Sequence, residues 1–338
     1  MDGASPAIML CGTCKAPGQF VLTESPRPAA APDGWVLVDI DRVGLCGTDF
    51  HIFEGKHPFL AYPRVIGHEL SGRIAVSAAG WQQGQPVTIN PYISCGDCVA
   101  CRKGKPNCCT GIAVLGVHRD GGMCDRIAVP SGNLYDAASL PEGAAVLTEF
   151  LAIGAHAVRR AGPAPGDRVL VTGAGPIGLG VALFARLKGA EVHLRDASAT
   201  RLRAMAAFGF DRITTASDPL PADGFDIVFD ATGNARAIEA GFAHVAHGGT
   251  YCLVSVVKDD ITFSDPEFHK REMTLMGSRN ATAEDFRMVM DALAIGAIDA
   301  GAIISATLPL ADLPDLFPAL VADREALIKV VVQIGARG

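Results

Sequence analysis

The sequence has little that would mark a nucleic-acid-binding, membrane or secreted protein. It contains no block of Lys and Arg, and 29 basic against 36 acidic side chains leave a formal net charge of −7. The electrostatic footprint of a binder of nucleic acid or of an anionic membrane is therefore missing. The opening residues, MDGASPAIMLCGTCK, have no cationic start followed by a long apolar run. We expect no secretory signal, a cytoplasmic location and small-molecule partners.

Long hydrophobic runs are also scarce. The most membrane-like stretch, residues 169–185, is uncharged but contains four glycines and is shorter than the roughly 18–20 residues that a spanning helix needs. It predicts a buried strand, a turn and a helix. No internal repeat is present, and the Ala/Pro-rich residues 26–32 are typical of a loop.

Length and composition indicate a compact enzyme with two domains. A chain of 338 residues exceeds the length at which one hydrophobic core stops growing. Hydrophobic residues make up 49% of the chain and charged residues 19%, which argues against extensive disorder. Ten cysteines in a cytosolic chain favour metal ligands or free thiols over a disulfide framework.

The hydrophobic pattern changes twice along the chain. From about residue 168 to residue 279, strand-like runs such as RVLVT and FDIVFD alternate with helix-like ones, which predicts βαβ units and a parallel sheet. Before about residue 153, short runs separated by Gly and Pro favour a mostly antiparallel domain with few helices. After residue 281, an amphipathic segment leads to the strand-like IISATLPL and LIKVVVQI. The expected fold class is α/β.

A glycine-rich motif, GAGPIG, follows RVLVT and opens the helix-like PIGLGVALFARL. In this context its glycines permit a tight turn, close approach of a pyrophosphate and helix–strand packing, and the helix N-terminus offers free N–H groups. Asp196 ends the next strand-like run and is placed to accept hydrogen bonds from the adenosine ribose. The alternative is a glycine-rich turn with a surface Asp. The candidate cofactor-binding residues are Gly173, Gly175, Pro176, Ile177, Gly178, Asp196 and Arg201.

The acidic Asp196 favours NAD over NADP, because its carboxylate repels a 2′-phosphate. Arg195 and Arg201 weaken this preference, since either side chain can meet a phosphate. The alternative places Arg195 at a solvated strand end and Arg201 on a helix surface.

Four cysteines are closely spaced in a loop-like stretch, as C-x2-C-x2-C-x7-C: Cys95, Cys98, Cys101 and Cys109. Four thiolates at this spacing can enclose Zn²⁺ with no open position, which is a structural site. Free surface thiols or a redox pair are the alternative, and Cys108 can in principle replace Cys109. Cys11 and Cys14 form an incidental CxxC, whereas Cys124 and Cys252 are expected to be packing residues.

A second set of metal-ligand residues is dispersed. It comprises Cys46 in VGLCGTDFH, His68 and Glu69 in VIGHELSG, and Glu149 in LTEFLAIGAHA. Each residue alone has an ordinary structural explanation. Together, a thiolate, an imidazole and one or two carboxylates suit a Zn²⁺ ion that keeps a position for water or substrate.

At these motifs the sequence resembles the zinc-containing medium-chain dehydrogenase/reductase family over nearly its whole length. GLCGTDFH, GHE, the four-cysteine lobe and GAGPIG occur in the family's order. The resemblance implies a GroES-like catalytic domain beside a Rossmann domain with a doubly wound parallel sheet. We expect residues 1–153 and 287–338 to form the catalytic domain and residues 154–286 the NAD-binding domain. The resemblance also implies that the chain assembles as a homodimer or homotetramer.

The resemblance implies roles for single residues. Cys46 and His68 are then ligands of the catalytic zinc, with Glu69 ligating or approaching the metal. Thr48 resembles the hydroxyl that takes the substrate proton and His51 the relay to solvent. Glu149 stands where liver-type alcohol dehydrogenases have a cysteine, which is similar to sorbitol and other polyol dehydrogenases.

Three segments look like the branch that acts on polyols and sugar acids such as L-galactonate or L-idonate: residues 116–123, 149–158 and 277–282. Arg279 lies where the family brings a loop towards the nicotinamide, and it is a candidate for a substrate carboxylate or a helix-capping surface residue. The expected enzyme carries two Zn²⁺ ions and oxidises a secondary alcohol with NAD. Rival hypotheses are a dehydrogenase of simple alcohols, a zinc-free reductase on the same fold and a non-catalytic nucleotide-binding member.

Overall fold

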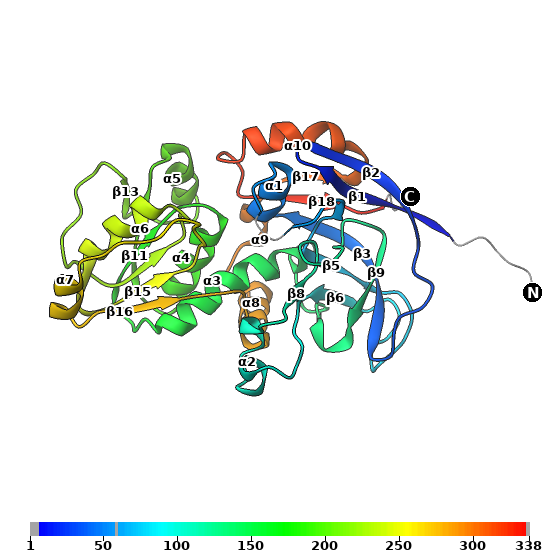
Figure 1. The fold of residues 1–338 in the computed structure, drawn as a ribbon, viewed down its shortest axis with the longest axis horizontal. Helices are drawn as coiled ribbons and strands as arrows, with labels where there is room; N and C mark the ends of the chain where they lie inside the picture. The colour runs from blue at the N-terminus through cyan, green and yellow to red at the C-terminus, as the bar shows by residue number, and fades with distance from the viewer. Residues whose placement is uncertain (1–6, 58–59, 336–338) are drawn as a thin grey trace, which may run out of the picture. The chain divides into compact units, whose positions relative to one another are not determined.

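The computed structural model describes residues 7–57 and 60–335 and divides into two compact units (Figure 1). Unit 1 comprises Met1–Glu149 and Met290–Gly338, and unit 2 comprises Phe150–Val289. The divisions fall inside helices α3 (Thr148–Ala161) and α8 (Ala283–Ala294), not at residues 153/154 and 286/287. A helix that continues across a division leaves no turn residues to mark it in the sequence. We expect no secretory signal in the opening residues of the chain. Residues 1–6 of that segment lie outside the described residues.

The described residues of unit 1 form three sheets, in which antiparallel pairing predominates as expected. The strands of the largest are β10 (Leu134–Asp136), β6 (Pro86–Ile89), β5 (Glu69–Ile74), β3 (Trp35–Leu45), β18 (Lys329–Gln333) and β17 (Ile304–Pro309), with β9 (Arg126–Pro130) paired to β3. The smaller sheets contain β2 (Gln19–Pro26), β1 (Ile8–Ala16) and β4 (Arg64–Val65), and β7 (Tyr92–Ile93) and β8 (Ala113–Val114). Only β17 and β18 pair in parallel among the described strands of this unit.

The long strand β3 organises the unit 1 core. Its first half pairs with β9 and its second half with β18, while β5 runs along most of its other edge. Val331 of β18 lies opposite Gly44 of β3, so the end of the chain completes a sheet that its beginning starts. Apolar residues of these strands form one buried cluster that includes Val38, Val43 and Val330.

Helices in unit 1 are short. They are α1 (Gly47–Phe53), α2 (Val99–Arg102), α9 (Ala300–Ile303) and α10 (Leu313–Ala322), with single turns at Pro106–Cys108, Ser131–Asn133, Ala145–Leu147 and Leu310–Asp312. This agrees with the Gly/Pro-interrupted pattern of the sequence.

Unit 2 contains a six-stranded parallel sheet. Its strands, from one edge to the other, are β13 (Ile213–Thr215), β12 (Glu191–Asp196), β11 (Arg168–Thr172), β14 (Phe225–Asp230), β15 (Val245–Leu253) and β16 (Thr274–Gly277). Its remaining helices are α4 (Pro176–Leu187), α5 (Ala199–Ala206), α6 (Ala235–Gly241) and α7 (Asp265–Lys270), with a single turn at Phe242–His244. In chain order the strands lie 3-2-1-4-5-6, which is the doubly wound Rossmann arrangement. The α/β fold class is confirmed.

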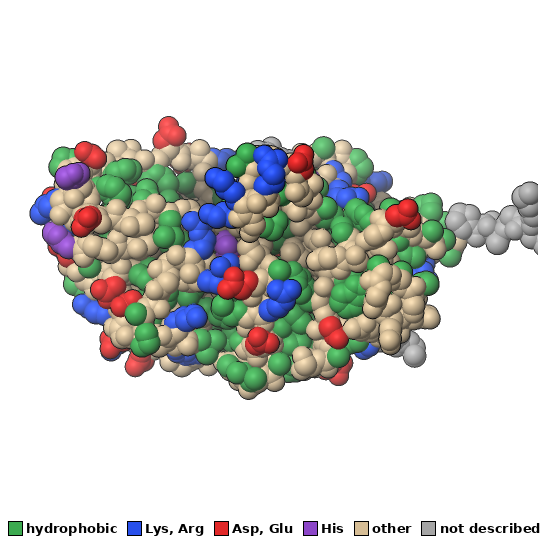
Figure 2. Space-filling view, turned by 90° about the horizontal axis from the view of Figure 1, so that it is seen from below, with side chains coloured by type: hydrophobic (Ala, Val, Ile, Leu, Met, Phe, Trp, Pro, Cys, Tyr) green, Lys and Arg blue, Asp and Glu red, His purple; other side chains and the backbone are tan. Residues whose placement is uncertain are grey.

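Residues 169–185 form most of β11, a glycine turn and most of α4, as the sequence predicts. The middle of β11 is wholly buried, which is typical of a parallel strand covered on both faces. Within the described residues, none of the helices has the length and apolar character needed to cross a membrane. On the face drawn in Figure 2, charged side chains of both signs stand among hydrophobic and neutral ones.

Candidate functional site

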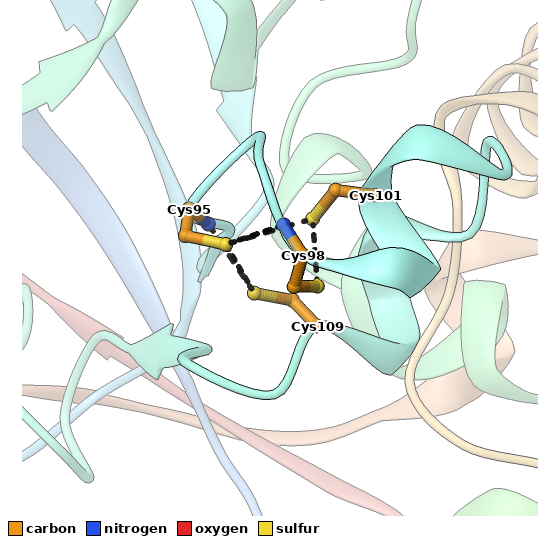
Figure 3. A group of neighbouring side chains, drawn as sticks. All are labelled: Cys95, Cys98, Cys101 and Cys109. Carbon is orange, nitrogen blue, oxygen red and sulfur yellow. Dashed lines mark hydrogen bonds between the residues drawn. The ribbon is translucent and has the colours of Figure 1, made fainter.

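The four closely spaced cysteines converge between β7 and β8 (Figure 3). The Sγ atoms of Cys98 and Cys101 lie 3.5 Å apart, those of Cys95 and Cys109 3.4 Å apart, and all four are within 4.8 Å of one another. Cys108 is not in the group. Backbone N–H groups of Cys101 and Thr110 lower the pKa of Cys98 to about 5, which favours the thiolate that a metal binds. The donor set therefore fits a closed Zn²⁺ site.

A second group joins Cys46, His68 and Glu69, whose ligand atoms also lie within 4.8 Å of one another. Cys46 follows β3 and precedes α1, whereas His68 and Glu69 stand at the start of β5. The β3–β5 pairing sets Gly44 opposite Glu69, and a Cβ at Gly44 would collide with the Glu69 carboxylate. Strand register and a required glycine thus bring the dispersed residues together.

Two charged residues that the sequence analysis missed surround this group. Asp49 is fully buried, accepts a hydrogen bond from the Cys46 N–H at 2.9 Å and places Oδ1 3.8 Å from His68 Nδ1. Burial opposes the charged imidazole, but the charges of Asp49, Cys46 and Glu149 and a hydrogen bond to Cys46 together outweigh burial and raise the pKa of His68 well above its usual value. Burial raises the pKa of Asp49.

The second missed residue is Lys329, the first residue of β18. Its Nζ donates to Glu69 Oε1 at 2.6 Å and to the Leu45 carbonyl at 3.1 Å. Glu69 Oε2 is buried and has no hydrogen-bond partner among the described residues, as is also true of His68 Nδ1. Buried acceptors without partners are uncommon, and a cation beside Cys46 would satisfy the carboxylate. These residues fit a zinc ion.

Glu149 is buried in unit 1 but is not part of the three-residue group. Its Oε1 accepts a hydrogen bond from the Tyr92 hydroxyl, and burial raises its pKa to about 7. Tyr92 was missed too, because no motif marks it. Thr48 and His51 lie three residues apart on α1, so they share a face of the helix. Thr48 Oγ1 is 3.8 Å from Cys46 Sγ, and His51 is exposed.

The glycine motif forms the turn between β11 and α4. Gly173 has φ +100°, and a Cβ at Gly178 would collide with the Gly173 carbonyl oxygen. Gly175 is the N-cap residue of α4, Pro176 is its first residue and Ile177 follows. Only glycine suits the two tight positions.

Asp196 ends β12 beside this turn. Its carboxylate accepts hydrogen bonds from the Ala174 N–H at 2.6 Å and the Ser198 N–H at 2.7 Å. Arg201 lies 4.0 Å from it, and Asp196, Arg195 and Arg201 line a cavity of about 370 Å³ together with Gly173. Arg195 donates to the Ala216 carbonyl at 2.6 Å in an exposed hydrogen bond.

The other residues singled out from the sequence lie elsewhere. Arg279 is exposed and follows β16 in unit 2. Cys124 and Cys252 are buried, in keeping with packing roles, and Cys11 and Cys14 of the incidental CxxC are buried too. Cys11 faces Cys124 across an isolated bridge.

Comparison with known proteins gives two family matches. Residues 32–142 match the alcohol dehydrogenase GroES-like domain, and residues 176–294 match the zinc-binding dehydrogenase model. L-galactonate-5-dehydrogenase of Escherichia coli K12 is 41% identical over 335 residues, which cover 94% of this chain and 97% of that protein.

Two solved structures are also similar. L-idonate 5-dehydrogenase of Escherichia coli K-12 superposes with a TM-score of 0.89 at 27% identity, over 97% of this chain and 98% of that one. A short chain alcohol dehydrogenase of Escherichia coli CFT073, complexed with cofactor NADH, gives a TM-score of 0.88 at 28% identity, over 96% and 99% of the two chains.

Proposed function

Because the chain belongs to the zinc-binding alcohol dehydrogenase family, we propose that it is a zinc-dependent dehydrogenase that oxidises a secondary alcohol of a polyol, sugar or sugar acid with NAD. The observation that carries this proposal is the convergence of Cys46, His68 and Glu69 around a buried carboxylate oxygen that has no partner among the described residues. A thiolate, an imidazole and a carboxylate form a catalytic rather than a closed zinc site.

In this proposal Cys46 and His68 hold the catalytic zinc, and Glu69 ligates or approaches it. Glu149 lies outside the three-residue group and is the fourth candidate ligand of the catalytic zinc. When bound, zinc acts as a Lewis acid that polarises the alcohol oxygen and lowers its pKa. Cys95, Cys98, Cys101 and Cys109 hold a second, structural ion, which gives two per chain.

The protein's own groups orient the ligands and move the proton. Asp49 faces the His68 ring and holds the Cys46 N–H, so it orients both ligands at once. Thr48 Oγ1, beside Cys46, accepts the hydroxyl proton of the substrate and passes it towards the exposed His51 one helical turn away. Imidazole titrates near neutral pH and can release that proton to water.

NAD is the proposed cofactor, with NADP the less favoured one. The Asp196 carboxylate is buried at the cavity wall and fixed by two backbone N–H groups, so it cannot swing away from a 2′-phosphate. Arg201 and Arg195 on the same wall are the groups that would oppose this preference.

The substrate class follows from Glu149 and from the relatives. A carboxylate ligand is harder and more easily displaced than a thiolate, so the metal can accept two adjacent substrate oxygens. The relatives described above are named for oxidation of L-galactonate and L-idonate at position 5. If the substrate is such an acid, Arg279 is the candidate for its carboxylate, because a guanidinium can bind both oxygens.

We also propose that the chain assembles as a homodimer or homotetramer. Strand β16 forms one edge of the parallel sheet, and its Leu275 is 37% exposed. An open strand edge with an exposed apolar side chain favours pairing with a second copy.

One experiment tests the enzyme proposal and its rivals. Purified protein is analysed for zinc and assayed for NAD⁺ reduction at 340 nm with aldonates, polyols and simple primary alcohols. We expect two zinc ions per chain and the highest kcat/KM for an aldonate or vicinal polyol. Higher kcat/KM for ethanol would support a dehydrogenase of simple alcohols, activity without zinc a zinc-free reductase, and no activity a non-catalytic member.

A further inference from the structure

Tyr92 is buried, and hydrogen bonds fasten its backbone beside the large sheet of unit 1. Its N–H donates to Asn90 Oδ1 at 2.9 Å, and its carbonyl accepts from Asn133 Nδ2 at 3.1 Å. The two asparagines are joined as well, because the Asn90 N–H donates to the Asn133 carbonyl at 2.8 Å. Asn90 follows β6 and Asn133 precedes β10, and these strands pair with each other. The tyrosine ring therefore extends from a fixed backbone.

The hydroxyl of Tyr92 donates to Glu149 Oε1. A tyrosine hydroxyl loses its proton only at about pH 10 or above, so near neutral pH it is a donor for a carboxylate. Glu149 follows the single turn at Ala145–Leu147, which packs against β3 and β5. Strand β3 leads to Cys46 and β5 begins with Glu69. Tyr92 thus holds a carboxylate that stands next to the strands of the candidate zinc site.

The two carboxylates of this region differ in what they face. Lys329 holds Oε1 of Glu69 and leaves Oε2 buried without a partner among the described residues. Glu69 belongs to the group whose ligand atoms lie within 4.8 Å of one another, whereas Glu149 does not. Burial opposes the charged form of His68, and the Glu149 charge is among those that nevertheless raise its pKa. Glu149 is therefore within electrostatic reach of the group but is bonded to Tyr92 instead.

A buried carboxylate needs a donor, and this need alone is the ordinary reason for such a hydrogen bond. Here the bond has a further consequence, because Glu149 is a fourth donor of a type that zinc accepts. Three protein ligands and an open position make a catalytic zinc site, whereas four protein ligands make a closed one. The group that holds Glu149 away decides which of the two forms.

We propose that Tyr92 is a positioning residue that holds Glu149 beside the Cys46–His68–Glu69 group, so that the fourth position at the zinc stays open to the substrate. This inference rests on the proposed zinc-dependent function. Tyr92 acts through Glu149. Without the Tyr92 hydroxyl, Glu149 becomes a fourth protein ligand, so the metal is held more firmly and added ligands bind more weakly.

Tyr92→Phe tests this, because it removes the hydroxyl and keeps the ring. In protein loaded with cobalt(II), imidazole that enters an open position changes the visible spectrum, whereas a closed four-cysteine site has no position for it. Imidazole is neutral, so its binding does not simply report the charge of Glu149. We expect its Kd to rise at least about tenfold in Tyr92→Phe, because Glu149 loses a charged-group hydrogen bond and competes for the position.

The rate of zinc release to excess chelator gives the second readout. It should fall in Tyr92→Phe, because four protein ligands replace three. Loss of a residue that merely supports a ligand already on the metal has the opposite effect and weakens metal binding. Faster zinc release, or an unchanged Kd for imidazole, would overturn the proposal.

Tyr251→Phe is the matched control, because Tyr251 is also buried, lies in unit 2 and donates to the Ile238 carbonyl at 3.0 Å. It should leave both readouts unchanged. Glu149→Gln is the second variant and should change the Kd for imidazole less than about twofold, since Glu149 is already held away. In that background Tyr92→Phe should have no further effect. Clearly tighter imidazole binding in Glu149→Gln would show that Glu149 occupies the position and would refute the role of Tyr92.

The cobalt titration uses no substrate, so it is separate from the test of the proposed function. Cobalt-loaded protein that binds imidazole but oxidises neither aldonate nor polyol refutes the proposed function, and the Tyr92→Phe titration then decides the role of Tyr92 by itself. A wild-type spectrum that does not respond to imidazole overturns the proposal, because the fourth position is then not open.

Discussion

The buried pair of Lys329 and Glu69 offers the sharpest test of how the candidate zinc site is held. The two side chains are 1% and 0% exposed, and Lys329 Nζ lies 2.6 Å from Glu69 Oε1. Burial disfavours the charged lysine, but the charges of Glu69, Cys46 and Glu149 and the hydrogen bond to Glu69 together outweigh burial and raise the pKa of Lys329. Lys329→Met keeps an apolar side chain of similar length and removes only the cation.

The expected loss of stability in Lys329→Met is large because the buried carboxylate of Glu69 remains without its partner. Removing one member of a buried ion pair costs about 3–5 kcal/mol, since the remaining charge is left uncompensated. For a unit of this size such a loss lowers Tm by about 6–20 °C. Lys329→Met combined with Glu69→Gln leaves no uncompensated charge, so it should recover at least about half of the loss.

Scanning calorimetry of chelator-treated and zinc-loaded protein measures these effects. Zinc beside Glu69 would compensate part of the missing charge, so the loss should be smaller in zinc-loaded protein. Lys56→Met is the control in the same unit, because Lys56 is 60% exposed and its pair with Glu54 should contribute no more than about 1 kcal/mol. A loss below about 1 kcal/mol in chelator-treated Lys329→Met, or no recovery in the double variant, would refute this reasoning.

Three further predictions concern other sites. Cys98→Ser should lower the zinc content from two ions per chain to one and reduce Tm. His68→Ala should abolish turnover and leave the circular dichroism spectrum unchanged. Full zinc content in both variants would contradict the two-site assignment. The kcat/KM for NAD⁺ should exceed that for NADP⁺ by at least about tenfold, which is about 1.4 kcal/mol, and a reversed ratio would show that the arginines dominate the cavity. Burial opposes ionisation of Asp285, but hydrogen bonds from His156 and Arg159 lower its pKa. The contribution of the Asp285 carboxylate to the stability of the folded protein is therefore complete above the usual Asp pKa and is lost as pH falls. Asp285→Asn should cost about 3–5 kcal/mol at pH 7 and flatten the decline of stability in acid, measured by urea unfolding from pH 7 to pH 3.

The sequence alone was enough to predict the two kinds of sheet and the turns between them. RVLVT followed by GAGPIG predicts a buried parallel strand, a tight turn and a helix, and the structure has β11, the turn at Gly173 and α4. These features depend on neighbours within a few residues, so local patterns carry them. The division inside α3 could not be predicted in the same way, because a continuous helix leaves no break in the pattern.

The convergence of the four cysteines was also predictable, since they lie within one short loop whose spacing brings the sulfur atoms together. Only the tertiary structure decided what surrounds the second group. Lys329 meets Glu69 across 260 residues and Tyr92 meets Glu149 across 57. These contacts arise from strand pairing and burial between distant segments, and neither leaves a periodic trace in the sequence. The residue types that can bind a metal were thus set by sequence, whereas the charges that hold those residues in place depend on which strands pair.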